Sequence, residues 1–451
     1  MPTSTTKLTG FRLLAFIATL LAGTFTMSIS QSALSTAYPT LMRYFAISAS
    51  TVQWLTTGFM LVMCVMMPVS PWLLDNLPFK PLFLSILGLF IGGTTLIIWA
   101  PNFGLVLLGR AGEAIAVGVL FPAFQTVLLT ITPAHKRGQI MGVAGLVMGS
   151  ALACGPIISG LILNYFSWQA LFIVFNLIIS FVFILAWLTI TNVMPYQPYD
   201  LDYQSISCMP GLIGLLYVIS TGNQPQLSWP WLWLILGISL CMLGYFIHRQ
   251  LTQATPLLNL SILHFKNYRI AVTLTALSYL SLIITTVIYP LYFQSILHLS
   301  PLVSGLALVP AAVVLSLLNP LTGKLADRVG FKPTLLLGLI MIMFGWLNLL
   351  LLAHKLTLPI MLVNACLIEG GNAFVMMPAV TLGANNIPAQ QLADGTAVTT
   401  TIRQISGALG VALVTLVITN FNATQAYPII FGTLLGLTIV GLRLAFSLKT
   451  Q

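Results

Sequence analysis

Apolar runs of about 20 residues recur along the whole of this 451-residue chain, and they constrain its fold more than any other feature. A helix of about 20 residues crosses the roughly 30 Å of hydrocarbon in a lipid bilayer. The short segments between the runs hold nearly all the charged residues, which make up only 5% of the chain against about a quarter in soluble proteins. The sequence therefore predicts an all-α polytopic membrane protein.

Fourteen of these runs are predicted to span the membrane. The seventh is the shortest, because sixteen residues reach only about 24 Å and Pro210 lies within it. The predicted spans are residues 11–36, 51–74, 81–100, 103–131, 139–163, 168–190, 206–221, 229–248, 269–293, 301–322, 333–353, 357–382, 396–419 and 428–447.

The distribution of Lys and Arg predicts the orientation, because short positively charged loops stay cytoplasmic. With both termini inside, only Arg43 and Lys355 lie outside, and Arg110 lies within the fourth span. The net charge of +10 then reflects topology and contact with anionic lipid, and a nucleic-acid partner is not needed to explain it. The residues expected at cytoplasmic ends are Lys7, Arg12, Lys80, Lys136, Arg137, Arg249, Lys266, Arg269, Lys324, Arg328, Lys332, Arg403, Arg443 and Lys449.

Similar segments recur in the chain at a nearly constant offset. Residues 75–81 read DNLPFKP and residues 327–333 read DRVGFKP, 252 positions later. Such an offset indicates a duplication in which spans 1 to 6 match spans 9 to 14, so that spans 7 and 8 are an insert. We expect a six-helix half over residues 1–192, a linker with two further helices over 193–255, and a second six-helix half over 256–451.

Two carboxylates stand alone within apolar spans of the two halves. Glu113 and Glu369 are offset by 256 positions, and a lone charge at bilayer depth costs about 2.5 to 3.5 kcal/mol. Arg110 can pair with Glu113 one helical turn away, which leaves a structural ion pair as the alternative to proton binding. Glu369 has Cys366 at the matching position, so its neutral form is favoured and we expect it to bind protons or substrate.

Several stretches together resemble a known membrane-protein family. With the parallel repeat they are similar to the major facilitator superfamily, and more narrowly to its fourteen-helix drug:proton antiporters. The resemblance implies the major facilitator fold, in which two six-helix halves enclose a central cavity faced by the first and fourth helices of each half. The stretches are Gln53-Trp54, SWQALFIVFNL (167–177), PLLNLSILHFKNYRIA (256–271), LYFQSILHLSPLVSGLALVP (291–310), GKLADRVGFKP (323–333) and DGTAVTTTIRQISGALG (394–410).

The resemblance also assigns a conformational role to the duplicated loop. Asp327 is expected to cap a helix start or pair with Arg328, Lys332 or a basic residue of a neighbouring helix, forming a latch that breaks when the halves rock. The first-half copy keeps Asp75 and Lys80 but lacks the leading glycine and the Asp-Arg pair. For both copies the alternative is a plain charged turn.

The fifth span carries a stretch, GSALACGPIISG, that resembles a motif of exporters within the superfamily. Small residues let another helix approach closely, and a proline weakens the helix, while ordinary packing is the alternative. The residues concerned are Gly149, Gly155, Pro156 and Gly160.

One feature of the family is absent from the first span. Where the family usually carries an acidic residue, three positions before the stretch Ala33 to Pro39, this chain has Ser30. Proton coupling would then rest on Glu113 and Glu369, or the protein would depart from a typical exporter of cations.

These features lead to the hypothesis of proton-coupled export, of the multidrug type, of hydrophobic small molecules that are cationic or amphipathic, by alternating access. The cavity is expected to be lined, on the fourth and twelfth spans, by Phe121, Phe124, Gln125, Asn372, Ala373 and Met376. Export of one specific metabolite, antibiotic or lipid is an alternative, and a non-transporting membrane sensor is another.

Other classes of function find little support in the sequence. No nucleotide-binding loop, nucleophile arrangement or metal-ligand cluster is present, and the five cysteines show no paired spacing. We therefore expect no enzyme, no metal and no cofactor, with a proton gradient as the energy source. The expected partners are a small-molecule substrate, protons and the lipid of the cell membrane, and the expected oligomeric state is a monomer.

Overall fold

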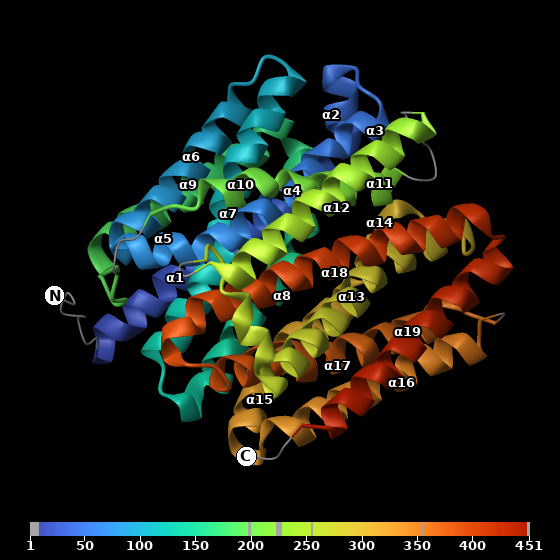
Figure 1. Cartoon of the computed structure of the whole chain (residues 1–451). Helices are drawn as coiled ribbons and strands as arrows, with labels where there is room; N and C mark the ends of the chain where they lie inside the picture. The colour runs from blue at the N-terminus through green and yellow to red at the C-terminus, as the bar shows by residue number, and fades with distance from the viewer. Residues whose placement is uncertain (1–8, 197–199, 222–227, 254–255, 354, 449–451) are drawn as a thin grey trace.

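The computed structural model describes residues 9–196, 200–221, 228–253, 256–353 and 355–448. Every regular element in this part is a helix, and thirteen helical segments are long and apolar enough to cross a membrane. Figure 1 shows them as one bundle of roughly parallel and antiparallel helices. The predicted all-α membrane fold is therefore confirmed. Lys7 and Lys449, used above for the orientation, lie outside the described residues.

The first half of the chain supplies six long helical segments, of which the second is divided at Pro68 into α4, η2 and α5. In order, its elements are α1 (Gly10–Ala33), η1 (Leu34–Ala37), α2 (Tyr38–Phe45), α3 (Ala49–Val52), α4 (Trp54–Met66), η2 (Met67–Val69), α5 (Ser70–Asn76), α6 (Phe79–Ile98), α7 (Phe103–Ile131), η3 (Ala134–Lys136), α8 (Arg137–Tyr165) and α9 (Trp168–Thr189).

The second half repeats this arrangement. Its elements are η4 (Leu260–His264), α13 (Lys266–Ser295), α14 (Pro301–Leu306), α15 (Val309–Val329), α16 (Phe331–Leu351), α17 (Leu358–Asn385), η5 (Ala389–Gln391), α18 (Leu392–Asn420) and α19 (Ala423–Phe446).

A matching lysine contact in each half follows the sequence repeat. The Lys80 Nζ donates to the carbonyl of Trp187 at 2.7 Å, near the end of α9. The Lys332 Nζ, 252 positions later, donates to the carbonyls of Phe446 and Leu448 at 2.8 and 2.9 Å, at the end of α19. Each lysine thus satisfies carbonyls and the negative dipole at the end of the sixth helix of its half.

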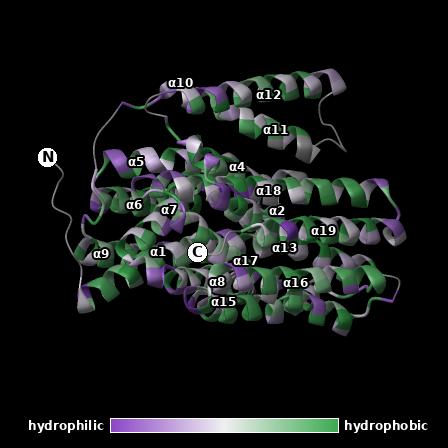
Figure 2. Cartoon of the chain, turned by 60° about the horizontal axis from the view of Figure 1, so that its bottom comes forward, coloured by the Kyte–Doolittle hydropathy of each residue, from purple (hydrophilic) through white to green (hydrophobic). Residues whose placement is uncertain are grey.

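The inserted segment forms α10 (Tyr203–Cys208), α11 (Pro210–Thr221) and α12 (Trp229–Thr252). The seventh predicted span is thus divided into two short helices, because Pro210 begins a new helix where it cannot continue the old one. Figure 2 shows α10, α11 and α12 at one side of the bundle. The apolar residues of α11 pack on α4 of the first half and α18 of the second.

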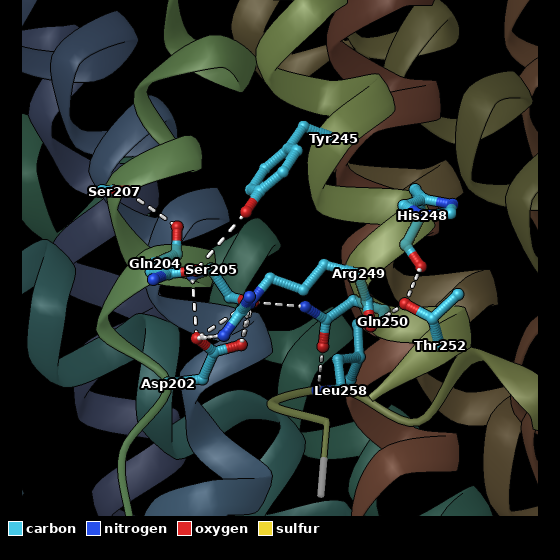
Figure 3. Close-up of polar contacts among 10 residues, drawn as sticks. All are labelled: Asp202, Gln204, Ser205, Ser207, Tyr245, His248, Arg249, Gln250, Thr252 and Leu258. Atoms are coloured by element: carbon cyan, nitrogen blue, oxygen red, sulfur yellow. Dashed lines mark hydrogen bonds and ion pairs between the residues drawn. The ribbon is translucent and has the colours of Figure 1, made fainter. Parts of the chain in front are cut away.

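A polar network fixes the insert at the start of the second half (Figure 3). The Asp202 carboxylate caps α10 and receives hydrogen bonds from the Arg249 guanidinium of α12 at 2.9 to 3.0 Å. Gln250 donates to the Ser205 hydroxyl at 2.6 Å and accepts from the backbone N–H of Leu258 at 3.0 Å. These bonds join α10, α12 and the segment that leads into α13.

Candidate functional site

Glu369 lies deep within α17 with half of its carboxylate unsatisfied. The side chain is 4% exposed. Its Oε2 accepts a hydrogen bond of 3.3 Å from the Asn372 amide, and the Asn372 Oδ1 accepts from the Ser278 hydroxyl of α13 at 2.8 Å. Its Oε1 has no hydrogen-bond partner in the described part of the chain. A buried carboxylate with a free oxygen is a place where a proton or a cation can bind.

Glu113 is in a different state, because both of its oxygens have partners. The Thr94 hydroxyl of α6 donates to Oε1 at 2.7 Å, and the Arg110 guanidinium forms an ion pair with Oε2. Arg110 also lies over the ring of Phe59, 4.2 Å from its centroid. The side chains of Glu113, Thr94 and Arg110 are all buried. The contacts therefore match the structural ion pair that the sequence left open as an alternative.

The two glutamates occupy different faces of their helices. In the first half, Gly93 of α6 lies against the backbone and side chain of Glu113. Gly345, 252 positions after Gly93, lies against Ile368. Glu369 is one position further along, so it is turned by about 100° around the helix axis and points toward α13 instead of α16. The offset of 256 in the sequence therefore conceals a difference in orientation.

The residues predicted to line a cavity divide between two environments. Ala373 and Met376 of α17 belong to one buried apolar cluster with Leu129 of α7 and Met141 of α8, so they lie where the halves meet. Phe121 and Phe124 pack edge to face in the core of the first half. We call the contact of α7 and α8 with α15, α17 and α18 the seam.

Gln125 and Asn372 complete the predicted set. Gln125 of α7 is fully buried, and neither atom of its amide has a partner among the described residues. The next residue, Thr126, is hydrogen-bonded to Thr396 of α18 across the seam. Asn372 holds Glu369, as described above. Gln125 is thus next to a contact between α7 and α18, and Asn372 itself connects α17 to α13.

Arg403 corrects the predicted distribution of charge. It was expected at a cytoplasmic end, but α18 begins at Leu392 and places Arg403 three turns into the helix, where it is 2% exposed. Its guanidinium lies 5.2 Å from the centroid of the Tyr279 ring of α13. Counting Lys and Arg along the sequence missed this residue, although its position inside a predicted span was the available signal.

Asp327 forms the predicted cap, and it does so across the seam. Its two oxygens accept the backbone N–H groups of Gly138 and Gln139, at 2.9 and 2.8 Å, at the start of α8. A carboxylate at a helix N-terminus is favoured by the unpaired N–H groups and the helix dipole. The pairing with Arg328 or Lys332 is wrong, since neither ion pair of the described residues includes Asp327, and Lys332 bonds the end of α19. The latch therefore joins the two halves.

Asp75 does not reproduce this contact. It is half-buried and forms no hydrogen bond or ion pair with the residues that the structure describes. The first turn of α18, where the matching cap would lie, contains Asp394, which accepts the backbone N–H of Asn259 at 2.9 Å. Like charges repel, so a second carboxylate is disfavoured there. The sequence correctly indicated a departure in the first-half copy.

The small residues of α8 serve two contacts. Gly149 lies against Ser316 of α15, and Gly155 lies against Ser32 and Ala33 of α1. A Cβ atom at Gly160 would have no atom of another described residue within 4 Å, so the close approach expected there is not found. The helix continues through Pro156, whose side chain lies outside the described set.

Comparison with known proteins gives a consistent result. The sequence profile of the Major Facilitator Superfamily matches residues 20–410 and 271–450. An uncharacterized MFS-type transporter, YcnB of Bacillus subtilis, is 34% identical over 90% of this chain and 86% of its own length. The lincomycin resistance protein LmrB of Listeria monocytogenes is 31% identical over 89% of this chain and 86% of its own. The proton:xylose symporter XylE shares the fold, with a TM-score of 0.70 and 12% identity over 97% of this chain and 96% of that one.

Proposed function

This chain belongs to the major facilitator superfamily, and from that premise we propose that it exports hydrophobic, cationic small molecules in exchange for protons. Membership makes it a multi-pass membrane transporter and not an enzyme. It also removes the alternative of a non-transporting sensor. In the proposal the protein works as a monomer in the cell membrane, with both termini in the cytoplasm.

The free oxygen of Glu369 is the observation that carries the proposal. A buried carboxylate can be neutralised by a proton or by a cationic substrate, and binding of one excludes the other. That competition is antiport, because the substrate can bind only when the proton has left. The bond from Asn372, itself held by Ser278, connects the state of this carboxylate to α13.

The drug-like class of substrate is supported by two observations. The related LmrB protein is named for resistance to lincomycin. The seam is rich in methionine, with Met141, Met376 and Met377 buried in it and Met148 packed beside them. Methionine side chains adapt to ligands of varied shape, which suits a transporter with several substrates.

Contacts at the predicted cytoplasmic end of the bundle support alternating access. We call it the basic end, because most Lys and Arg residues are expected there. The Arg137 guanidinium of α8 bonds the carbonyl of Leu129 and the Asn385 amide of α17, both at 2.9 Å. Asp327 caps α8 at the same end. The bonds from Arg137 to Asn385 and from the start of α8 to Asp327 connect the two halves on the predicted cytoplasmic side, whereas the bond from Arg137 to Leu129 lies within the first half. The bonds between the halves must break when that side opens.

A proteoliposome assay tests the proposal. Purified protein is reconstituted, a pH gradient is imposed and movement of ethidium is followed by fluorescence. We expect gradient-driven transport by the wild type and its loss in Glu369→Gln, whereas Asp200→Asn, which removes an exposed carboxylate, keeps it. Gradient-driven transport by Glu369→Gln would remove this residue from coupling.

A specific antibiotic or metabolite as the sole substrate is the second candidate. It is favoured by Ser30, which replaces the acidic residue of related exporters and is buried without a partner for its hydroxyl in the described part of the chain. Absence of transport for every cationic dye, with transport of a single compound such as lincomycin, would favour this candidate.

A further inference from the structure

Arg403 is a buried cation without a counter-ion. Its Nε and Nη1 have no hydrogen-bond partner among the described residues, and neither of the ion pairs in that part of the chain includes it. The ring of Tyr279 supplies a cation–π contact, with the guanidinium carbon 5.2 Å from the ring centroid. Leaving a charged donor buried and unpaired is costly, so the position requires another interaction.

The helix geometry places Arg403 at the seam between the halves. Thr396 is seven residues earlier in α18, which is close to two turns, so both side chains lie on one face. Thr396 is bonded to Thr126 of α7 in the first half. The neighbouring Gln404 reaches α4, with its amide nitrogen 3.8 Å from the sulfur of Met63. Arg403 therefore lies among helices of both halves.

The surroundings of Arg403 are shaped to hold the tyrosine ring in place. Gly407, one turn after Arg403, lies beside the same ring, and a Cβ atom at Gly407 would be 2.8 Å from the Tyr279 Cε1. The ring thus lies against α18 at both Gly407 and the Arg403 guanidinium. Tyr279 is partly exposed, while Arg403 is almost completely buried. This arrangement places the guanidinium beside a tyrosine that keeps part of its surface exposed.

We propose that Arg403 and Tyr279 bind a carboxylate or another anionic group on an aromatic substrate. The planar guanidinium matches a carboxylate with two parallel hydrogen bonds, and the free Nε and Nη1 are donors for them. The ring of Tyr279 can stack against the aromatic body of the same molecule. This inference rests on the proposed export function and adds acidic and zwitterionic amphiphiles to its substrates.

The two charged positions lie on different faces of α13. Ser278 is linked through Asn372 to Glu369, and the adjacent Tyr279 lies beside Arg403. Adjacent side chains on a helix diverge by about 100° around its axis. A cationic group at Glu369 and an anionic group at Arg403 would therefore bind on different sides of this helix, so a substrate can carry either one without competing for the other site.

Equilibrium binding to the purified full-length protein in detergent tests this inference without a pH gradient. Two dyes with the same tricyclic core are compared by fluorescence anisotropy, the carboxylate fluorescein and the cation rhodamine 6G. Loss of a charge-assisted pair of hydrogen bonds in Arg403→Gln should weaken fluorescein binding by about tenfold or more and change rhodamine binding by less than about twofold. Arg443→Gln, which removes an arginine at the end of α19, should bind both dyes like the wild type.

The conservative variants separate binding from folding. Arg403→Lys keeps the charge and should retain part of the affinity for fluorescein, while Tyr279→Leu should weaken it without removing the charge. The inference is overturned by a wild type that does not bind fluorescein, by unchanged binding in Arg403→Gln, or by equal loss of both dyes. Complete displacement of fluorescein by chloride would assign the site to an inorganic anion and overturn it as a substrate site. Absence of proton-driven ethidium transport by the wild type would instead refute the proposed function.

Discussion

Three buried charged groups differ in whether they have an ion-pair or hydrogen-bond partner. Glu113 is paired with Arg110 and accepts a hydrogen bond from Thr94, so its charge is balanced, although the Arg110 Nε and Nη2 have no partner in the described part of the chain. Glu369 keeps one free oxygen and Arg403 keeps two free nitrogens among the described residues, and neither belongs to an ion pair there. At the scale of single residues, a buried charge without an ion-pair partner is therefore the feature that indicates chemistry.

The pairing of Arg110 with Glu113 predicts strong non-additivity. Arg110→Gln leaves Glu113 buried and uncompensated, which should destabilise the protein by about 3 to 5 kcal/mol. The double variant Arg110→Gln/Glu113→Gln should recover most of that loss and keep proton-driven transport. Thermal unfolding in detergent and the ethidium assay measure the two effects. A double variant that is well folded but uncoupled would show that the pair takes part in proton transfer.

Sequence reasoning found the buried carboxylates because each interrupts a long apolar run. It could not find their orientation, since Glu113 and Glu369 share a place in the repeat but differ by about 100° around the helix. It also placed Arg403 at a membrane surface, because rules for orientation count charges near the ends of spans and say nothing of a cation held by an aromatic ring. Such contacts depend on packing between helices that are far apart in the sequence.

At the scale of elements, the inserted helices are attached by polar bonds as well as by apolar packing. Burial by itself would raise the pKa of Asp202, but the hydrogen bonds from Arg249 and Ser205 outweigh it and hold that pKa below its usual value. A depressed pKa means that the bond stabilises the folded state fully above the unfolded pKa of about 3.9, and that this stabilisation is lost as the pH falls through the folded value.

The Asp202 network predicts how the insert responds to mutation and to pH. Asp202→Asn should speed hydrogen exchange across α10 and α11, because Arg249 loses its partner, and Asp200→Asn, an exposed acid two residues away, should not. In the wild type, exchange corrected for its chemical rate should be the same at mildly acidic and neutral pH. Opening of α10 on mild acidification alone would contradict the assigned role of Asp202.

The positions of the long helices could be predicted from the sequence more fully than the contacts between them. The apolar runs predicted the long helices, and the repeat predicted that Lys80 and Lys332 belong to one motif, but not that they bond the ends of α9 and α19. The cap from Asp327 to α8 was predicted only as a class of contact, because its partner lies 188 or more residues away in the other half. Pairings of that range follow from the fold and not from local pattern.

At the scale of the whole molecule, a latch at one end of the bundle is combined with charged residues buried in its interior. Asp327 of α15 and Arg137 of α8 hold the halves together at the basic end, while Glu369 and Arg403 are buried within α17 and α18. Rocking of the halves would break the first contacts and change access to the second. Exchange of a proton for a substrate at Glu369 is the step that gives this motion a direction.

Proton release on substrate binding measures that step most directly. Ethidium is added to purified protein in weakly buffered solution near neutral pH, and a pH indicator records the protons released. The account predicts release of up to about one proton per protein by the wild type and by Arg110→Gln/Glu113→Gln, and none by Glu369→Gln while it still binds the dye. Release that persists in Glu369→Gln would contradict the account.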